Sequence, residues 1–112
     1  MTAPRRLHVL ASFALIGGVL FGCSPREVAD AAVERAARTV ITPVVDDLVT
    51  GMQAQAATDC ILANASPEEK QALARDVGTI AGTTTRARVA AIVARPETQT
   101  CLNAAGVPPL GL

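Results

Sequence analysis

The chain has 112 residues, and its ten basic and ten acidic side chains leave no net charge at neutral pH. This length suffices for one small domain, and the charge balance argues against nucleic-acid binding, which favours a concentrated positive surface. The single histidine, His8, and both aromatic residues, Phe13 and Phe21, lie before residue 22. The remainder therefore has no imidazole for Ser-His-Asp, Cys-His or histidine-metal chemistry. We predict a protein that is not an enzyme and that holds no metal.

The first 22 residues have the pattern of an export signal. Arg5 and Arg6 form a basic segment, residues 9–21 form an apolar run, and the small residue Gly22 ends it. A helix over residues 9–21 would be about 20 Å long, against a bilayer hydrocarbon core of ~30 Å. We therefore predict a cleaved signal peptide over residues 1–22; the alternatives are an uncleaved anchor helix or a buried core helix.

The tetrapeptide Leu20-Phe21-Gly22-Cys23 resembles the lipobox of bacterial lipoproteins. The resemblance implies cleavage before the cysteine and a covalent lipid such as palmitate on Cys23, with no other cofactor. Ser24 follows, where an aspartate would retain a lipoprotein at the inner membrane. The resemblance therefore implies a lipid-anchored protein of the cell envelope, at the periplasmic face of the outer membrane.

Two cysteines remain after this segment, Cys60 and Cys101. An exported chain meets an oxidising compartment, which favours a disulfide between them; the alternative is two free buried thiols. Closing a loop of about 40 residues would contribute roughly 4 kcal/mol in the chain-entropy description. Because a small domain has a net stability of only ~5 kcal/mol, we expect this bond to matter greatly for folding.

Helical signals begin directly after the lipobox. Ser24 can cap a helix and Pro25 suits its first position, so we predict a helix from residue 25 to about residue 40. Pro43 lacks a backbone donor and disfavours helical geometry at the residue before it. We therefore favour a second helix over residues 43–62, the alternative being one long helix that kinks at Pro43.

Val40, Val44, Leu48 and Met52 recur every four residues and form an apolar stripe along this predicted helix. Core packing is its first interpretation. The second is a candidate partner face that binds an envelope protein or a second copy of the chain.

The clearest helix start is at Ser66 and Pro67, where the serine can cap and the proline takes the first helical position. We predict a helix from there to about residue 82 that carries Leu73, Val77 and Ile80 on one face. Another helix is expected over residues 85–94.

Pro96 begins a last short helix, which carries Cys101 and ends at Gly106. Residues 107–112 form a Pro-rich tail that is either laid against the bundle or disordered. The predicted fold is all-α: a small bundle of four to five short helices over residues 23–106, after the cleaved signal helix.

A second resemblance covers residues 58–107. The segments Thr58-Asp59-Cys60-Ile61, Asn64-Ala65-Ser66 and Arg95-Pro96-Glu97-Thr98 before Cys101 are similar to short uncharacterised proteobacterial lipoproteins. Some of those proteins carry the name succinate dehydrogenase. The sequence has no flavin-binding fingerprint, iron–sulfur cysteine set or haem histidine that would support that activity here.

These observations predict a lipid-anchored cell-envelope protein that acts as a non-enzymatic interaction or structural module. Its expected contacts are the membrane, through the lipid on Cys23, and an envelope protein or a second copy; nucleic acid and metal are not expected. The alternative is an accessory subunit or inhibitor of an envelope enzyme, including one of the succinate-dehydrogenase-named kind. Disulfide exchange by Cys60 and Cys101 is a distant third hypothesis. It ranks last because the pair lacks the C-x-x-C spacing that lowers the pKa of a thiol.

Overall fold

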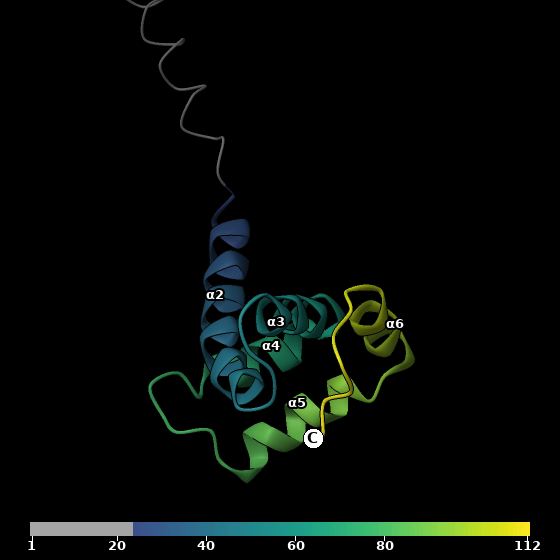
Figure 1. Ribbon diagram of the computed structural model, residues 1–112. Helices are drawn as coiled ribbons and strands as arrows, with labels where there is room; N and C mark the ends of the chain where they lie inside the picture. The colour runs from purple at the N-terminus through teal and green to yellow at the C-terminus, as the bar shows by residue number, and fades with distance from the viewer. Residues whose placement is uncertain (1–23) are drawn as a thin grey trace, which may run out of the picture. The chain divides into compact units, whose positions relative to one another are not determined.

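The computed structural model describes residues 24–112, and every regular element in that range is an α-helix (Figure 1). The predicted signal peptide and the predicted lipid-bearing Cys23 lie outside the described residues. The five helices are α2 (Pro25–Asp46), α3 (Met52–Asn64), α4 (Pro67–Ala74), α5 (Thr83–Val93) and α6 (Pro96–Ala104). The all-α class and the upper helix count are therefore confirmed. None of these helices combines the length and the apolar character needed to cross a bilayer.

The hydrophobic core lies within the compact unit Ala31–Leu112. Each helix contributes at least one large side chain that is fully buried or nearly so; these include Ile41, Ile61, Leu73, Ile92 and Leu102. The tail joins them, because Val107 is 5% exposed and its amide donates to the carbonyl of Leu102 at 3.0 Å. The tail is therefore laid against an aliphatic core.

Helix α2 runs through Pro43 without a break, so the predicted boundary between two helices there is wrong. The proline lies in the last turn, where a missing donor disturbs few later hydrogen bonds. The carbonyl that would have accepted this donor belongs to Thr39, an exposed residue that water can reach. Val44 and Val45, directly after the proline, are 1% and 0% exposed, so burial of their side chains holds the last turn in place.

The predicted helix over residues 43–62 is also wrong, because a turn divides it. The amides of Leu48 and Val49 both donate to the carbonyl of Val45, at 2.9 and 3.0 Å. Gly51 then takes a φ of +63°, a left-handed conformation that glycine adopts without steric cost. Helix α3 begins at the next residue.

Helix α4 ends at Ala74, well short of the predicted end near residue 82. Val77 and Ile80 therefore lie outside the helix, 46% and 97% exposed, and the predicted helix face that they share with Leu73 is wrong. Gly78 has a φ of +83°, and the Thr79 amide and hydroxyl both donate to the Asp76 carbonyl, at 3.1 and 2.7 Å. These local bonds replace the helix with a turn.

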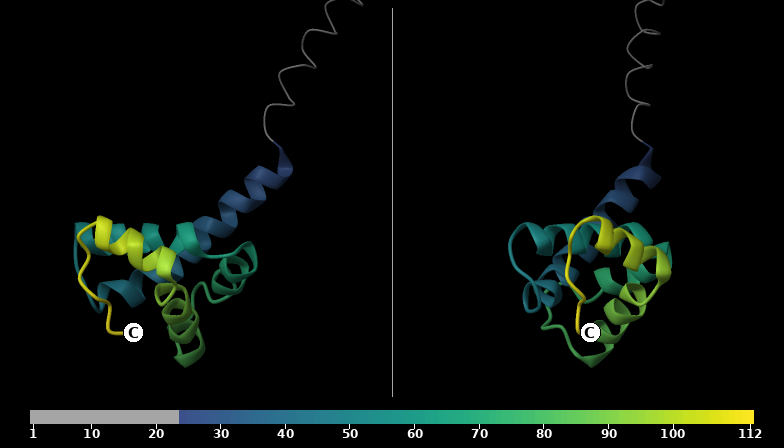
Figure 2. Two further views of the ribbon diagram at one scale, coloured as in Figure 1. Left: turned by 90° about the vertical axis from the view of Figure 1, so that its right-hand side faces the viewer. Right: turned by 45° about the vertical axis from the view of Figure 1, so that its right-hand side comes forward.

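The predicted disulfide between Cys60 and Cys101 is confirmed, with an S–S distance of 2.03 Å and a Cα–Cα distance of 5.7 Å. It joins α3 to α6, the most extensively packed pair of helices in the described chain (Figures 1 and 2). Cys60 is buried and Cys101 is half-buried. The bond therefore fixes an interface that is already well packed.

Replacing both cysteines, as Cys60→Ala/Cys101→Ala, should lower the free energy of unfolding by roughly 4 kcal/mol, because the bond closes a loop of 41 residues. Urea titration followed by circular dichroism measures this change. A reducing agent should bring the wild-type midpoint close to that of the variant and leave the variant itself unaffected. Equal midpoints for the two oxidised proteins would show that the bond adds no stability.

Candidate functional site

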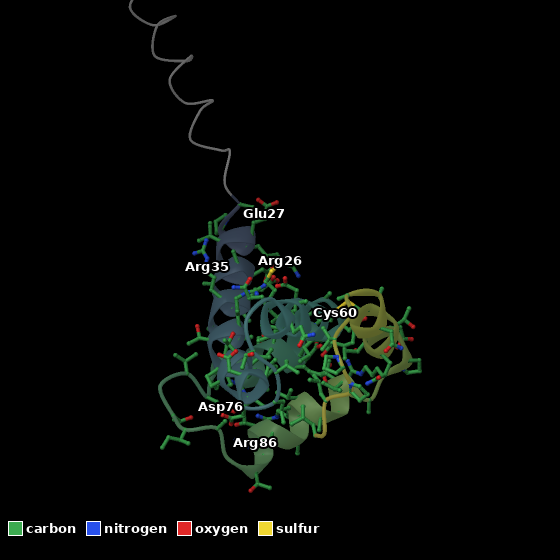
Figure 3. The ribbon with its side chains drawn as sticks, in the orientation of Figure 1. Arg26, Glu27, Arg35, Cys60, Asp76 and Arg86 are labelled. Carbon is green, nitrogen blue, oxygen red and sulfur yellow. A yellow bond between two sulfur atoms is a disulfide. The ribbon has the colours of Figure 1, made fainter. Side chains whose placement is uncertain are left out.

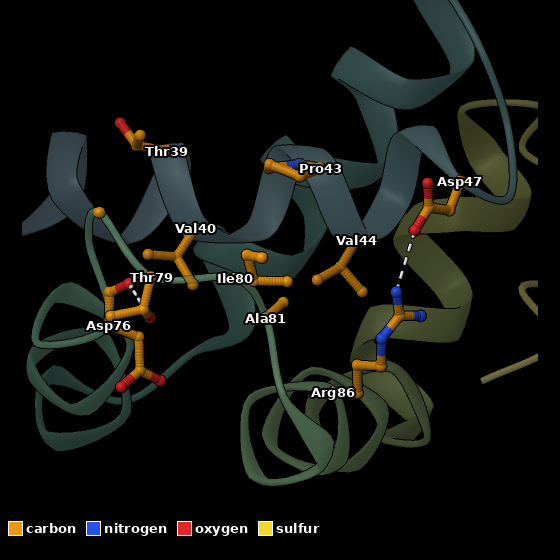
Figure 4. Close-up of a pocket in the computed structure, with 11 residues that line it drawn as sticks. Thr39, Val40, Pro43, Val44, Asp47, Asp76, Thr79, Ile80, Ala81 and Arg86 are labelled. Carbon is orange, nitrogen blue, oxygen red and sulfur yellow. Dashed lines mark hydrogen bonds and ion pairs between the residues drawn. The ribbon is translucent and has the colours of Figure 1, made fainter.

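A groove of about 270 Å³ lies between the second half of α2 and the segment that connects α4 to α5 (Figure 4). The α2 side is lined by Thr39, Val40, Pro43 and Val44, and Asp47 lies just beyond the helix end. The opposite side is lined by Asp76, Gly78, Thr79, Ile80 and Ala81, with Arg86 from α5. The groove therefore exists only because segments about 40 residues apart in sequence lie side by side.

The floor of the groove is apolar. Val40 and Val44 are 7% and 1% exposed, so they belong to the core and only a small part of each side chain faces the groove. Ala81 is half-buried against the same core. Ile80 differs from all of these, because 97% of it is exposed. The groove is thus bordered by a large apolar side chain that makes almost no contact with its own chain.

The rim of the groove carries paired charges. Arg86 Nη2 donates to Asp47 Oδ2 at 3.0 Å, and both side chains are about half exposed. Such a pair contributes little stability, because solvent screens it, but it places both signs of charge side by side. Arg88 Nη1 lies 3.8 Å from Asp76 Oδ2, too far for a hydrogen bond but close enough to offset that carboxylate's charge.

The Asp76 carboxylate anchors the loop to α5. Its Oδ2 accepts a hydrogen bond of 2.8 Å from the hydroxyl of Thr85, which is only 5% exposed. The hydroxyl therefore holds the loop rather than facing the groove. In Figure 3, Asp76 and Arg86 lie together beside α5, and Cys60 lies apart from them near α6. The groove and the disulfide are separate features.

The predicted partner face is divided by the end of α2. Val40 and Val44 lie on α2 and line the groove, whereas Leu48 lies in the following turn and Met52 begins α3. Leu48 and Met52 are 37% and 87% exposed. The four residues therefore do not form one helical stripe, and only the first two belong to the groove. Whether any of them binds a partner stays a prediction.

A second polar cluster joins the ends of four helices. The Ser66 hydroxyl accepts from the Glu69 amide at 3.1 Å, and the Ser66 amide donates to Glu69 Oε1 at 2.9 Å. This capping box confirms the predicted start of α4. Arg95 donates to Glu69 Oε2 at 2.8 Å and to the Asn64 carbonyl at 2.7 Å, which links the junction of α5 and α6 to α3 and α4.

Burial raises the pKa of Glu69, but the hydrogen bonds from the Ser66 amide, from Arg95 and from the Ser66 hydroxyl, together with the Arg95 charge, outweigh it. The pKa of Glu69 therefore lies below its ordinary value of 4.5. The carboxylate is held in its ionised form by these neighbours, as a structural link. Within residues 24–112, no group of three or more acidic or cysteine side chains is arranged to hold a metal ion.

Sequence reasoning missed Ile80, because its spacing from Leu73 and Val77 fits a helix. Gly78 was the available signal, since glycine often marks a left-handed turn. The Asp47–Arg86 and Glu69–Arg95 pairs span 39 and 26 residues, and no local pattern indicates them.

Comparison of this chain with protein-family models, with curated proteins and with solved structures finds no match. The groove and the disulfide are therefore assigned from the geometry of this chain alone.

Glu69→Gln should lower the melting temperature at neutral pH, because it removes the charge that binds Arg95. A depressed pKa means that the stabilisation is fully present above pH 4.5 and is lost as the pH falls through the folded-state pKa. The difference from wild type should therefore shrink in acid, as measured by thermal unfolding at a series of pH values.

Glu68→Gln is the matched control, because Glu68 lies in the same first turn of α4 but takes no part in the capping box. It should have a smaller effect at neutral pH. A melting-temperature difference for Glu69→Gln that is the same at pH 3 and pH 7 would contradict a stabilising role for the ionised carboxylate.

Proposed function

We propose that this protein is a lipid-anchored cell-envelope protein that works as a non-enzymatic interaction module. Cys23 is the proposed lipid attachment site, and the helical domain after it supplies the interaction. The lipobox-like tetrapeptide that ends at Cys23 supports the anchor. Two acyl chains or more hold a protein firmly at a bilayer, since each buried CH₂ contributes roughly 0.8 kcal/mol.

The Cys60–Cys101 disulfide supports export. Disulfides persist in oxidising compartments and are rare where thiols are kept reduced. Here the bond joins two packed helices and one of its cysteines is buried, which is typical of a structural bond. Catalytic thiols are instead partly exposed and activated by nearby positive charge. The geometry thus favours a structural bond over disulfide exchange.

The observation that carries the interaction role is Ile80 at the border of the groove. A single exposed apolar residue is ordinary on protein surfaces. Ile80 is unusual because it is 97% exposed and borders a concave surface with an apolar floor. Burial of such a side chain against a partner would be worth about 1.5–3 kcal/mol.

The polar groups of the groove support binding rather than catalysis. The carboxylates of Asp47 and Asp76 are already engaged by Arg86 and Thr85. The Thr79 hydroxyl is engaged by the Asp76 carbonyl. A nucleophile needs an adjacent base that is free to take its proton. These groups are instead occupied by hydrogen bonds within the chain.

Cys23→Ser tests the anchor. The wild-type chain should be recovered from the membrane fraction with a lipid mass on an N-terminal Cys23, whereas the variant should carry no lipid, because it lacks the sulfur that forms the thioether. Cell fractionation and mass spectrometry of the intact protein measure both properties. Cys60→Ser/Cys101→Ser is the matched control and should keep the lipid. A full-length wild-type chain with an unmodified Cys23 would refute the proposal.

A further inference from the structure

We infer that the groove is a self-association surface, in which Ile80 of one copy enters the groove of a second copy of this chain. The inference rests on the proposed role as an interaction module and names its partner. Three properties of the described residues support it: an almost fully exposed apolar side chain, a concave apolar floor beside it, and a rim in which opposite charges are paired.

Ile80 lies in a loop whose two ends are tied together by hydrogen bonds. The turn before it is closed by the two hydrogen bonds from Thr79 to the Asp76 carbonyl, at 3.1 and 2.7 Å. The Asp76 carboxylate is bonded to the buried Thr85 on α5 at 2.8 Å. Because the ends of the loop are tied, less backbone freedom is lost when Ile80 binds than in an open loop, and more of the burial energy appears as affinity.

The groove beside Ile80 can receive an apolar side chain. Its floor is formed by edges of Val40 and Val44, with Pro43 and Ala81 next to them. Ile80 and the groove lie on the same face of the domain. In two copies related by a two-fold axis, the Ile80 side chain of each copy can therefore enter the groove of the other. A two-fold interface requires this self-complementarity, since the same patch lies on both sides.

The charges on the rim favour a second copy over a lipid surface. On the rim, Asp47 lies beside Arg86 at 3.0 Å, and Asp76 lies 3.8 Å from Arg88, which is outside the groove lining. An anionic bilayer attracts surfaces with surplus positive charge, and this rim has none. A rim with both signs can meet its own two-fold copy with opposite charges in register.

Anchoring to one bilayer would help this contact. Two domains confined to a surface meet at a higher effective concentration than free domains do. A weak pairing in solution could therefore be sufficient on the membrane.

The test is sedimentation velocity of the full chain, extracted from membranes in a density-matched detergent, over a range of protein concentrations. The wild-type chain should form a dimer. Ile80→Asp should raise the dimer dissociation constant by about a hundredfold or more, because both copies lose a buried isoleucine. Ile80 makes almost no contact within its own chain, so the variant should keep the wild-type circular dichroism spectrum.

Met52→Asp is the matched control, because Met52 is also largely exposed, at 87%, but lies outside the groove lining. It should leave the dissociation constant unchanged. A wild-type chain that stays monomeric at every concentration would overturn the inference and leave a lipid or another protein as the occupant of the groove. A dimer that Ile80→Asp does not weaken would also overturn it. Neither result bears on whether Cys23 carries a lipid, because the mass of the intact protein tests that separately.

Discussion

The bond between Cys60 and Cys101 is the constraint on which the arrangement of this domain depends. The core contains no aromatic side chain among the described residues, and a small domain without large aromatic side chains buries little area. The disulfide offsets this by joining α3 to α6. The tail follows α6, and Val107 is buried on the core while its amide donates to the Leu102 carbonyl.

Local signals predicted the parts of the fold that local chemistry determines. The start of α4 followed from Ser66 and Pro67, because the capping groups lie within four residues of one another. Pro43 misled, because the rule that proline ends a helix takes no account of the residues after the proline. Buried Val44 and Val45 keep α2 helical for one more turn, and their burial depends on contacts with other helices.

The candidate site was harder to predict from the sequence than the fold was. The spacing of Val77 and Ile80 from Leu73 fitted one helix face, but the turn at the left-handed Gly78 breaks that pattern and both residues are exposed. The groove also needs α2 beside the loop after α4, a contact between distant segments that periodicity cannot indicate. The disulfide was predictable because the remaining cysteines allow only one pair.

The order of the two cysteines along the chain has a consequence for biogenesis. In a polypeptide that is threaded through a translocation channel with its N-terminus first, Cys60 emerges while Cys101 is still 41 residues behind. During that interval α3 has no α6 to pack against, and its thiol is accessible to oxidants and to other nascent chains. In the exported chain proposed above, the native pair can therefore form only after the distal segment has emerged.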